Sequence, residues 1–190
     1  MLENIFVYGA IPANAEKGTY IPLLVLASYI VASFGSYAGL TLATQIFRAE
    51  TKQKKRILHW TGAFALGVGI WSMHFIGMLA YKMRMTVYYD PFLTALSLLI
   101  AVMISYAALQ ITQTGKLSLQ RIVGSAVLLG IGICAMHYTG MAAMQMRADL
   151  RYTPPLFFLS VAVAIIASGA ALWIIFTLGR HSGRWKTGWM

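Results

Sequence analysis

Five long apolar stretches dominate the sequence. They cover approximately residues 20–47, 57–80, 92–112, 122–146 and 156–178. A helix that crosses a bilayer needs about 20 mostly apolar residues, whereas a barrel strand needs about 10 and alternates in polarity. Because lipid cannot satisfy backbone N–H and C=O groups, such stretches must be helical. The sequence therefore predicts an all-α, polytopic membrane bundle of five transmembrane helices.

The charged residues are few and lie mainly between these stretches. Only 11% of the residues are charged, compared with about 25% in a typical soluble domain. The net charge of +10 comes from short loops, a pattern that is typical of membrane orientation and not of a nucleic-acid surface. We therefore expect the chain to contact a lipid bilayer and no nucleic acid.

The distribution of basic residues predicts the orientation of the helices. Ten basic residues lie in the segments 48–56, 113–121 and 180–190, and five lie on the opposite side together with four of the five acidic residues. Basic residues accumulate in cytoplasmic loops. We therefore expect the N-terminus outside and the C-terminus in the cytoplasm.

The sequence repeats itself at a constant offset. Residues 73–80 align with 136–143, and the same offset takes Ser97 to Ser160. The predicted parts are an external segment (1–19), a transmembrane domain (20–179) and a basic tail (180–190), with repeat one at 20–80, repeat two at 92–146 and a half repeat at 156–178. A third unit would place another histidine near position 200. We expect an excised fragment or a natural protein of two and a half repeats.

Each repeat carries one histidine inside an apolar stretch. His74 and His137 fall at similar depths near the outer ends of the second and fourth stretches. Ionisable groups at membrane depth usually face the bundle interior and mark function. A methionine four residues later shares the helix face of each histidine, and a second one precedes it. The candidate metal ligands are His74, His137, Met73, Met78, Met136 and Met141.

Sulfur and imidazole ligands together favour a transition metal, and thioethers favour Cu(I). Met83 and Met146, at equivalent repeat positions, and Cys134 are weaker candidates. Three alternatives stay open: a haem held by paired His or His/Met ligands, an ion carrier, or a metal-free membrane anchor in which each histidine bonds a neighbouring helix. His59 is expected to be solvated at the cytoplasmic interface. The sequence contains no catalytic constellation, so we expect no enzyme.

At the two motifs the chain resembles the MHYT domain family. Met136-His137-Tyr138-Thr139 is the tetrapeptide that gives the family its name, Met73-His74-Phe75-Ile76 is similar to it, and Tyr89-Asp90-Pro91 also matches. The resemblance covers about residues 20–178. It implies a bacterial inner-membrane sensor whose Met and His residues bind copper near the outer face and detect a diatomic gas such as O2, CO or NO.

Such domains are usually fused to cytoplasmic output domains that make or break cyclic di-GMP, or to a histidine kinase. The resemblance therefore implies that the output is carried by another part of the protein, and a homodimer is left open.

Overall fold

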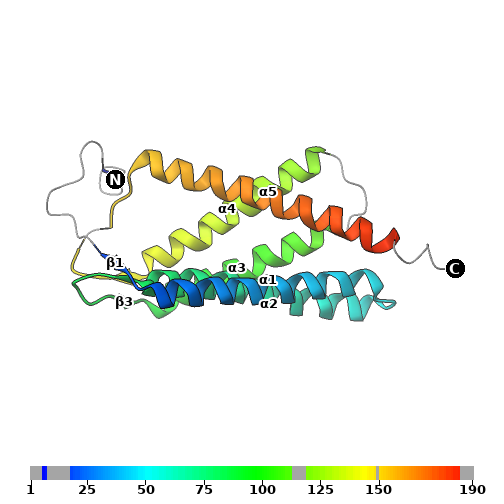
Figure 1. The fold of residues 1–190 in the computed structure, drawn as a ribbon, viewed down its shortest axis with the longest axis horizontal. Helices are drawn as coiled ribbons and strands as arrows, with labels where there is room; N and C mark the ends of the chain where they lie inside the picture. Colours follow the sequence, from blue (N-terminus) through cyan, green and yellow to red (C-terminus); the bar gives the residue numbers. More distant parts are fainter. Residues whose placement is uncertain (1–5, 8–17, 113–118, 149, 185–190) are drawn as a thin grey trace.

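The computed structural model describes residues 6–7, 18–112, 119–148 and 150–184. Within them it has five helices: α1 (Pro22–Arg48), α2 (Lys52–Ala80), α3 (Pro91–Thr112), α4 (Leu119–Ala142) and α5 (Pro154–Arg184). Figure 1 shows that they run lengthwise through an elongated bundle, in which α4 and α5 cross. All five are long and apolar enough to span a membrane, which confirms the predicted fold class.

Local sequence explains where the helices begin. Helices α1, α3 and α5 start at a proline, whose fixed φ suits the first helical turn and whose missing N–H leaves no donor unsatisfied there. Asp90 precedes α3, and its Oδ1 accepts a hydrogen bond from Leu93 N at 2.8 Å. Thr51 caps α2 by accepting from Lys54 N at 3.2 Å. These side chains satisfy donors that a helix start otherwise leaves unpaired.

Two short antiparallel strand pairings lie at one end of the bundle, which we call the hairpin end. Each pairing closes one pair of helices. Strand β1 (Thr19–Tyr20) pairs with β2 (Tyr81–Lys82), and β3 (Tyr88–Tyr89) pairs with β4 (Met144–Gln145). Figure 1 places β1 and β3 at the same end. Since β2 and β4 follow the two motif-bearing helices at the same offset, the sequence repeat is also a repeat in structure.

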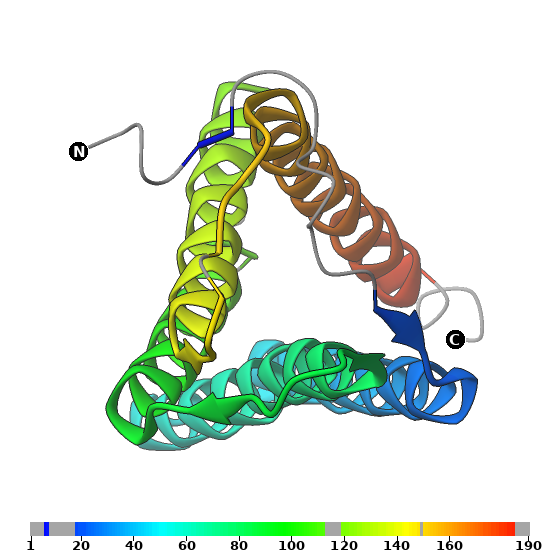
Figure 2. The same cartoon turned by 90° about the vertical axis from the view of Figure 1, so that its left-hand side faces the viewer.

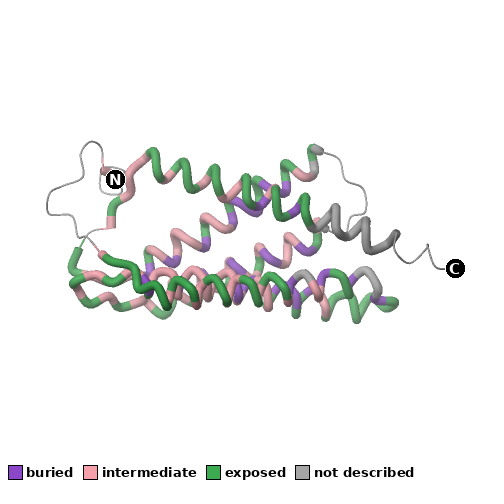
Figure 3. The backbone as a smooth tube through the Cα atoms, in the orientation of Figure 1, coloured by how far each residue is buried: buried purple, intermediate pink, exposed green. Residues whose placement is uncertain are grey.

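Each helix packs mainly against its neighbours in the sequence, with α2 between α1 and α3, and α4 between α3 and α5. Viewed end-on, α1 and α2 lie along one side of a triangle and α4 and α5 along the other two (Figure 2). Figure 3 shows long exposed stretches along α1 and α5. Within their most apolar windows, 6% of α1 and 11% of α5 are buried, compared with 33% of α4. The core therefore lies around α2, α3 and α4.

Glycines allow the closest helix crossings. A Cβ on Gly67 of α2 would lie 2.7 Å from Val102 Cα of α3, and a Cβ on Gly130 of α4 would lie 2.7 Å from Ile165 Cα of α5. The two pairs are related by the repeat offset. Small residues let membrane helices approach backbone to backbone, so the same device fixes the α2–α3 and α4–α5 crossings.

The structure differs from the sequence-based expectation in several boundaries. Helix α2 begins at Lys52, so the predicted basic loop is partly the first turn of a helix. Helix α4 ends at Ala142, because the chain then turns into β4. Helix α5 continues to Arg184, which makes the start of the predicted tail helical, and residues 185–190 lie outside the described residues. The division into an external segment, a transmembrane domain and a tail stays a prediction, as does the orientation in the membrane.

The expectation for His59 is wrong. Its side chain is 5% exposed, because its ring lies against Tyr106 of α3 with centroids 5.7 Å apart. Its Nδ1 lies 2.9 Å from the Lys55 carbonyl oxygen, to which it donates. His59 lies about two turns inside α2, where one large neighbour can bury a polar residue, and hydropathy alone does not reveal that neighbour.

Candidate metal centre

The two motif histidines meet between α2 and α4. The Nδ1 atoms of His74 and His137 are 3.3 Å apart, and the ring centroids are 4.6 Å apart at an interplanar angle of 57°. One Nδ1–H therefore donates to the other Nδ1, and which ring carries the proton is a matter of tautomer. The structure thus brings together two imidazoles from different repeats of the sequence.

Gly140 makes room for the His74 ring on α4. A Cβ at Gly140 would lie 2.8 Å from His74 Nε2 and 3.1 Å from its Cδ2. That Nε2 atom is buried and has no hydrogen-bond partner among the described residues. A Cβ at the equivalent Gly77 would meet nothing within 4 Å. The two motifs are therefore alike in sequence but not in surroundings, since only Gly140 accommodates a histidine.

The candidate methionines occupy the same two helices. Met136 is 3% exposed, and Met73, Met78 and Met141 are half-buried. Cys134 is half-buried on α4, and Met83 and Met146 are half-buried just beyond β2 and β4. In the part of the chain that the structure describes, His, Cys, Asp and Glu form no group of three or more that could hold a metal. Of the predicted ligands, this leaves the methionines to complete the site beside the two histidines, and these ligand roles stay predictions.

An aromatic ring packs beside each histidine in a repeated pattern. Phe75 contacts His74 with centroids 5.5 Å apart, and Tyr138 contacts His137 with centroids 5.0 Å apart. Phe75 packs on Tyr89 and Tyr138 packs on Tyr152. The members of each equivalent pair are related by the repeat offset. Each motif-bearing helix, α2 or α4, therefore carries a histidine followed by an aromatic residue. The ring of that aromatic residue packs on the tyrosine that precedes the next helix.

These tyrosines at the hairpin end stay neutral. Burial raises the pKa of Tyr89. Burial, and then the nearby Tyr138, raise the pKa of Tyr152. Neither phenol therefore adds charge beside the histidines at neutral pH.

Two hydrogen bonds tie the motif helices to the helices that follow them. Trp71 Nε1 donates to Ser97 Oγ of α3 at 2.9 Å, and the Tyr138 hydroxyl lies 2.7 Å from Ser160 Oγ of α5. The sequence alone indicates no more than a wall or packing role for Trp71, and it does not single out Tyr138. The repeat does point to the two serines, because Ser97 and Ser160 are equivalent in it. The sequence does not say which aromatic residue forms a hydrogen bond with each serine.

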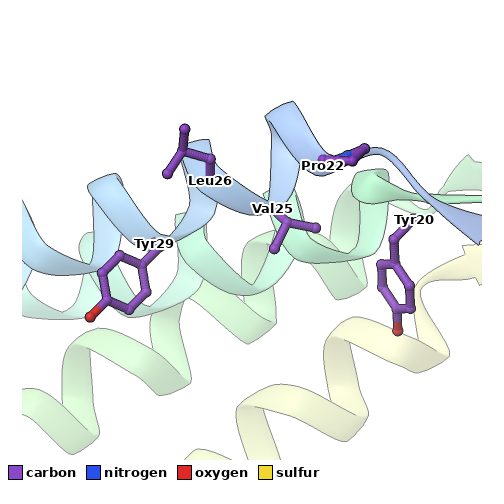
Figure 4. A pocket seen from close by; sticks show the side chains of 5 residues that line it. All are labelled: Tyr20, Pro22, Val25, Leu26 and Tyr29. Atoms are coloured by element: carbon purple, nitrogen blue, oxygen red, sulfur yellow. The ribbon is translucent and has the colours of Figure 1, made fainter.

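An apolar groove lies away from the histidines, on α1 near β1. It has a volume of about 680 Å³ and is lined by Tyr20, Pro22, Val25, Leu26 and Tyr29 (Figure 4). Its lining is exposed and contains none of the motif residues. In a chain of five membrane-spanning helices, this groove lies on a surface that lipid can cover.

The fold and the site define a class: a multi-pass membrane protein built from repeated helix pairs, with one histidine from each repeat at a shared contact. The family model for MHYT, described as a bacterial signalling protein N terminal repeat, matches residues 67–125 and 130–188. The two matches begin at the equivalent glycines Gly67 and Gly130. The chain belongs to the MHYT family.

Proteins similar to this chain include two from Pseudomonas aeruginosa. One is the bifunctional diguanylate cyclase/cyclic di-GMP phosphodiesterase MucR, 48% identical over 87% of this chain and 24% of its own length. The other is the cyclic di-GMP phosphodiesterase NbdA, 41% identical over 90% of this chain and 22% of its own length. The signaling protein YkoW of Bacillus subtilis is 36% identical over 86% of this chain and 20% of its own length.

The chain spans about a quarter or less of the length of these relatives. The part that it matches is the signalling repeat, and the chain itself is not an enzyme. No solved structure matches it.

Proposed function

We propose that this chain is a membrane sensory module that binds a soft transition metal, copper as Cu(I), between α2 and α4. The observation that carries the proposal is the Nδ1 to Nδ1 distance of 3.3 Å between His74 and His137. Two nitrogens that bind one tetrahedral ion at about 2.0–2.1 Å lie about 3.3–3.4 Å apart. The two rings are thus already at the separation that a shared ion requires.

The surroundings of His74 support the same proposal. Its Nε2 is buried without a partner among the described residues, a state that it shares with Nε2 of His59, and an ion held by Nδ1 would leave this nitrogen where it is, beside Gly140. Metal binding by one ring nitrogen fixes the tautomer and leaves the other nitrogen to a second partner. Both imidazoles must be neutral to bind, and thioethers on the same helices, such as Met136, complete a set that prefers Cu(I).

The geometry favours a single ion over a haem held by both histidines. Axial nitrogens on opposite sides of an iron would be about 4 Å apart, with ring centroids about 6 Å apart, when each metal–nitrogen bond is about 2.0 Å. The observed centroids are 4.6 Å apart, which leaves no space for a porphyrin between the rings. Haem stays the second candidate only through a single histidine, and a Soret band would reveal it.

We further propose that the signal is a diatomic gas, O2, CO or NO, or the redox state, and that it reaches a cytoplasmic output region. A bound copper ion would supply an open coordination position or a change of charge. The names of two relatives state cyclic di-GMP turnover, which supports a cyclic di-GMP output, with a kinase as the other option. The basic first turn of α2, Lys52 to Arg56, supports a cytoplasmic position for the end opposite the hairpins.

Elemental analysis of the detergent-purified protein tests the metal. The wild type is expected to contain about one copper ion per chain after anaerobic Cu(I) loading and removal of excess metal, with no Soret band. The His74→Ala/His137→Ala double variant is expected to lose it, because both nitrogens of the pair are removed.

The matched control is His59→Ala, since His59 is also a buried helix histidine but lies outside the pair. Its copper content is expected to equal that of the wild type. Equal copper in the wild type and the double variant would reject the site and leave a metal-free membrane anchor as the better description.

A further inference from the structure

We propose that Tyr138 couples the histidine pair to α5, through its hydrogen bond to Ser160. This inference rests on the proposed function and adds the route by which the site acts on the rest of the bundle. It concerns a positioning residue, because Tyr138 acts through His137 on one side and Ser160 on the other.

The hydrogen bonds at Ser160 have a defined direction. The Ser160 hydroxyl donates to the Phe157 carbonyl oxygen at 2.7 Å. Since a hydroxyl has one hydrogen to donate, Ser160 Oγ can only accept from Tyr138, whose hydroxyl lies 2.7 Å away. Tyr138 therefore donates to a serine that is itself anchored to the first turns of α5.

The Tyr138 ring is in contact with His137 and is held on its other side by α5. Its centroid lies 5.0 Å from that of His137 at 78°, 4.8 Å from that of Phe157 and 5.2 Å from that of Tyr152. A ring that contacts three other rings and donates to Ser160 cannot follow a displaced His137 unless Ser160 moves with it or the hydrogen bond breaks. Either outcome changes how α5 sits on α4.

The equivalent contact in the other repeat is less direct, because Trp71 reaches His74 through the Phe75 ring, whose centroid lies 4.6 Å from that of Trp71 and 5.5 Å from that of His74. Ser97 of α3 also donates to a carbonyl oxygen three residues earlier, that of Thr94, at 2.8 Å. Its donor is Trp71, which precedes His74 by three residues, while Phe75 in the position of Tyr138 has no hydroxyl. The α2–α3 bond therefore starts one turn away from the histidine, whereas the α4–α5 bond starts at the residue next to it.

This difference makes the two hydrogen bonds a matched pair for experiment. Tyr138→Phe and Trp71→Phe each remove one aromatic donor to an equivalent serine and keep an aromatic ring. If the bond merely held helices together, both variants would behave alike. If Tyr138 couples the site to α5, only Tyr138→Phe should uncouple them.

Distances between spin labels measure the coupling directly. Gadolinium labels attached through genetically encoded amino acids at Leu99 of α3 and Ile166 of α5, which are 56% and 70% exposed, leave Cys134 intact. The full chain in lipid nanodiscs is measured without metal, after Cu(I) loading and after addition of CO. Copper is quantified in the same samples.

The wild type is expected to show a change in the label distance on Cu(I) loading or on CO addition. Tyr138→Phe and Ser160→Ala are expected to bind the wild-type amount of copper and to lose that change. Trp71→Phe is expected to keep it, and Ser160→Thr, which retains a hydroxyl, is expected to restore it.

The remaining outcomes overturn the inference in distinguishable ways. A wild type that binds copper without a change in distance, or a Tyr138→Phe variant that shifts like the wild type, rejects the coupling and leaves the metal site standing. Loss of copper in Tyr138→Phe would make the tyrosine part of the metal-holding structure instead. A wild type that binds no Cu(I) removes the proposed function and this inference together.

Discussion

The α2–α3 and α4–α5 interfaces are two copies of one design that differ in detail. Both cross at a glycine facing backbone, Gly67 against Val102 and Gly130 against Ile165. Both place a serine of the following helix as acceptor for an aromatic donor. The donor itself differs, since it is a tryptophan in one interface and a tyrosine in the other. The comparison teaches that the glycine crossing and the serine acceptor are the same in both interfaces. The aromatic donor differs, so it can serve a second role in one of them.

The family model divides the chain in a way that agrees with this comparison. Its two matches begin at Gly67 and Gly130, so each matched unit contains the second half of a motif-bearing helix and the helix after it. The contacts that recur in the structure also join a motif helix to its successor. The repeated packing unit is therefore a motif-bearing helix with its successor, α2–α3 or α4–α5. The strand pairings at the hairpin end join different pairs, α1–α2 and α3–α4.

The largest expected effect concerns the two crossings. Gly67→Ala and Gly130→Ala should each lower the free energy of unfolding by about 2 kcal/mol, because the added Cβ would lie 2.7 Å from rigid backbone, where overpacking costs about 3 kcal/mol, and the gain in helix propensity returns only about 1 kcal/mol. Unfolding by SDS titration in mixed micelles measures it. Gly124→Ala is the control, since nothing lies within 4 Å of its added Cβ. Unequal losses at Gly67 and Gly130 would break the equivalence of the interfaces.

The next effect separates the two motif glycines. Gly140→Ala should weaken Cu(I) binding by about tenfold, the lower end of what changes around metal ligands usually cost, because the new Cβ would lie 2.8 Å from His74 Nε2. Gly77→Ala should leave the affinity unchanged, since its added Cβ meets open space. Competition with a Cu(I) chelator measures both. Equal losses would mean that the glycines act on the helices in general and not on the His74 ring.

Much of this arrangement could be predicted from the sequence, for physical reasons. The length of the apolar stretches determines the spans, and the repeat offset relates the two histidines at similar depths. The sequence repeat is also a repeat in structure because each unit folds by the same local rules.

Several features depend on neighbours that no pattern in the sequence identifies. The two-residue strands β1 to β4 are too short to show a periodicity. The burial of His59 depends on Tyr106, and the contrast between Gly77 and Gly140 arises although both follow a histidine by three residues. The motifs predict which residues face the bundle, but the packing decides which of two equivalent residues meets the other histidine.

The smallest expected effect concerns the serines shared by the repeats. Ser97→Ala removes a bonded hydroxyl and should cost about 0.6–1 kcal/mol, the usual value of a side-chain hydrogen bond between membrane helices. Ser105→Ala and Ser168→Ala should be neutral or slightly stabilising, because these hydroxyls are buried without a partner in the described parts of the chain. The same SDS titration compares all three.

Ser105 and Ser168 are related by the repeat offset, so they test whether the equivalence extends to residues with no visible bond. A loss of stability at both would mean that each hydroxyl has a partner in the membrane, such as a water molecule or a helix packed on the same face. A loss at only one would place that partner in a single interface, and the two interfaces would then differ in more than their aromatic donors.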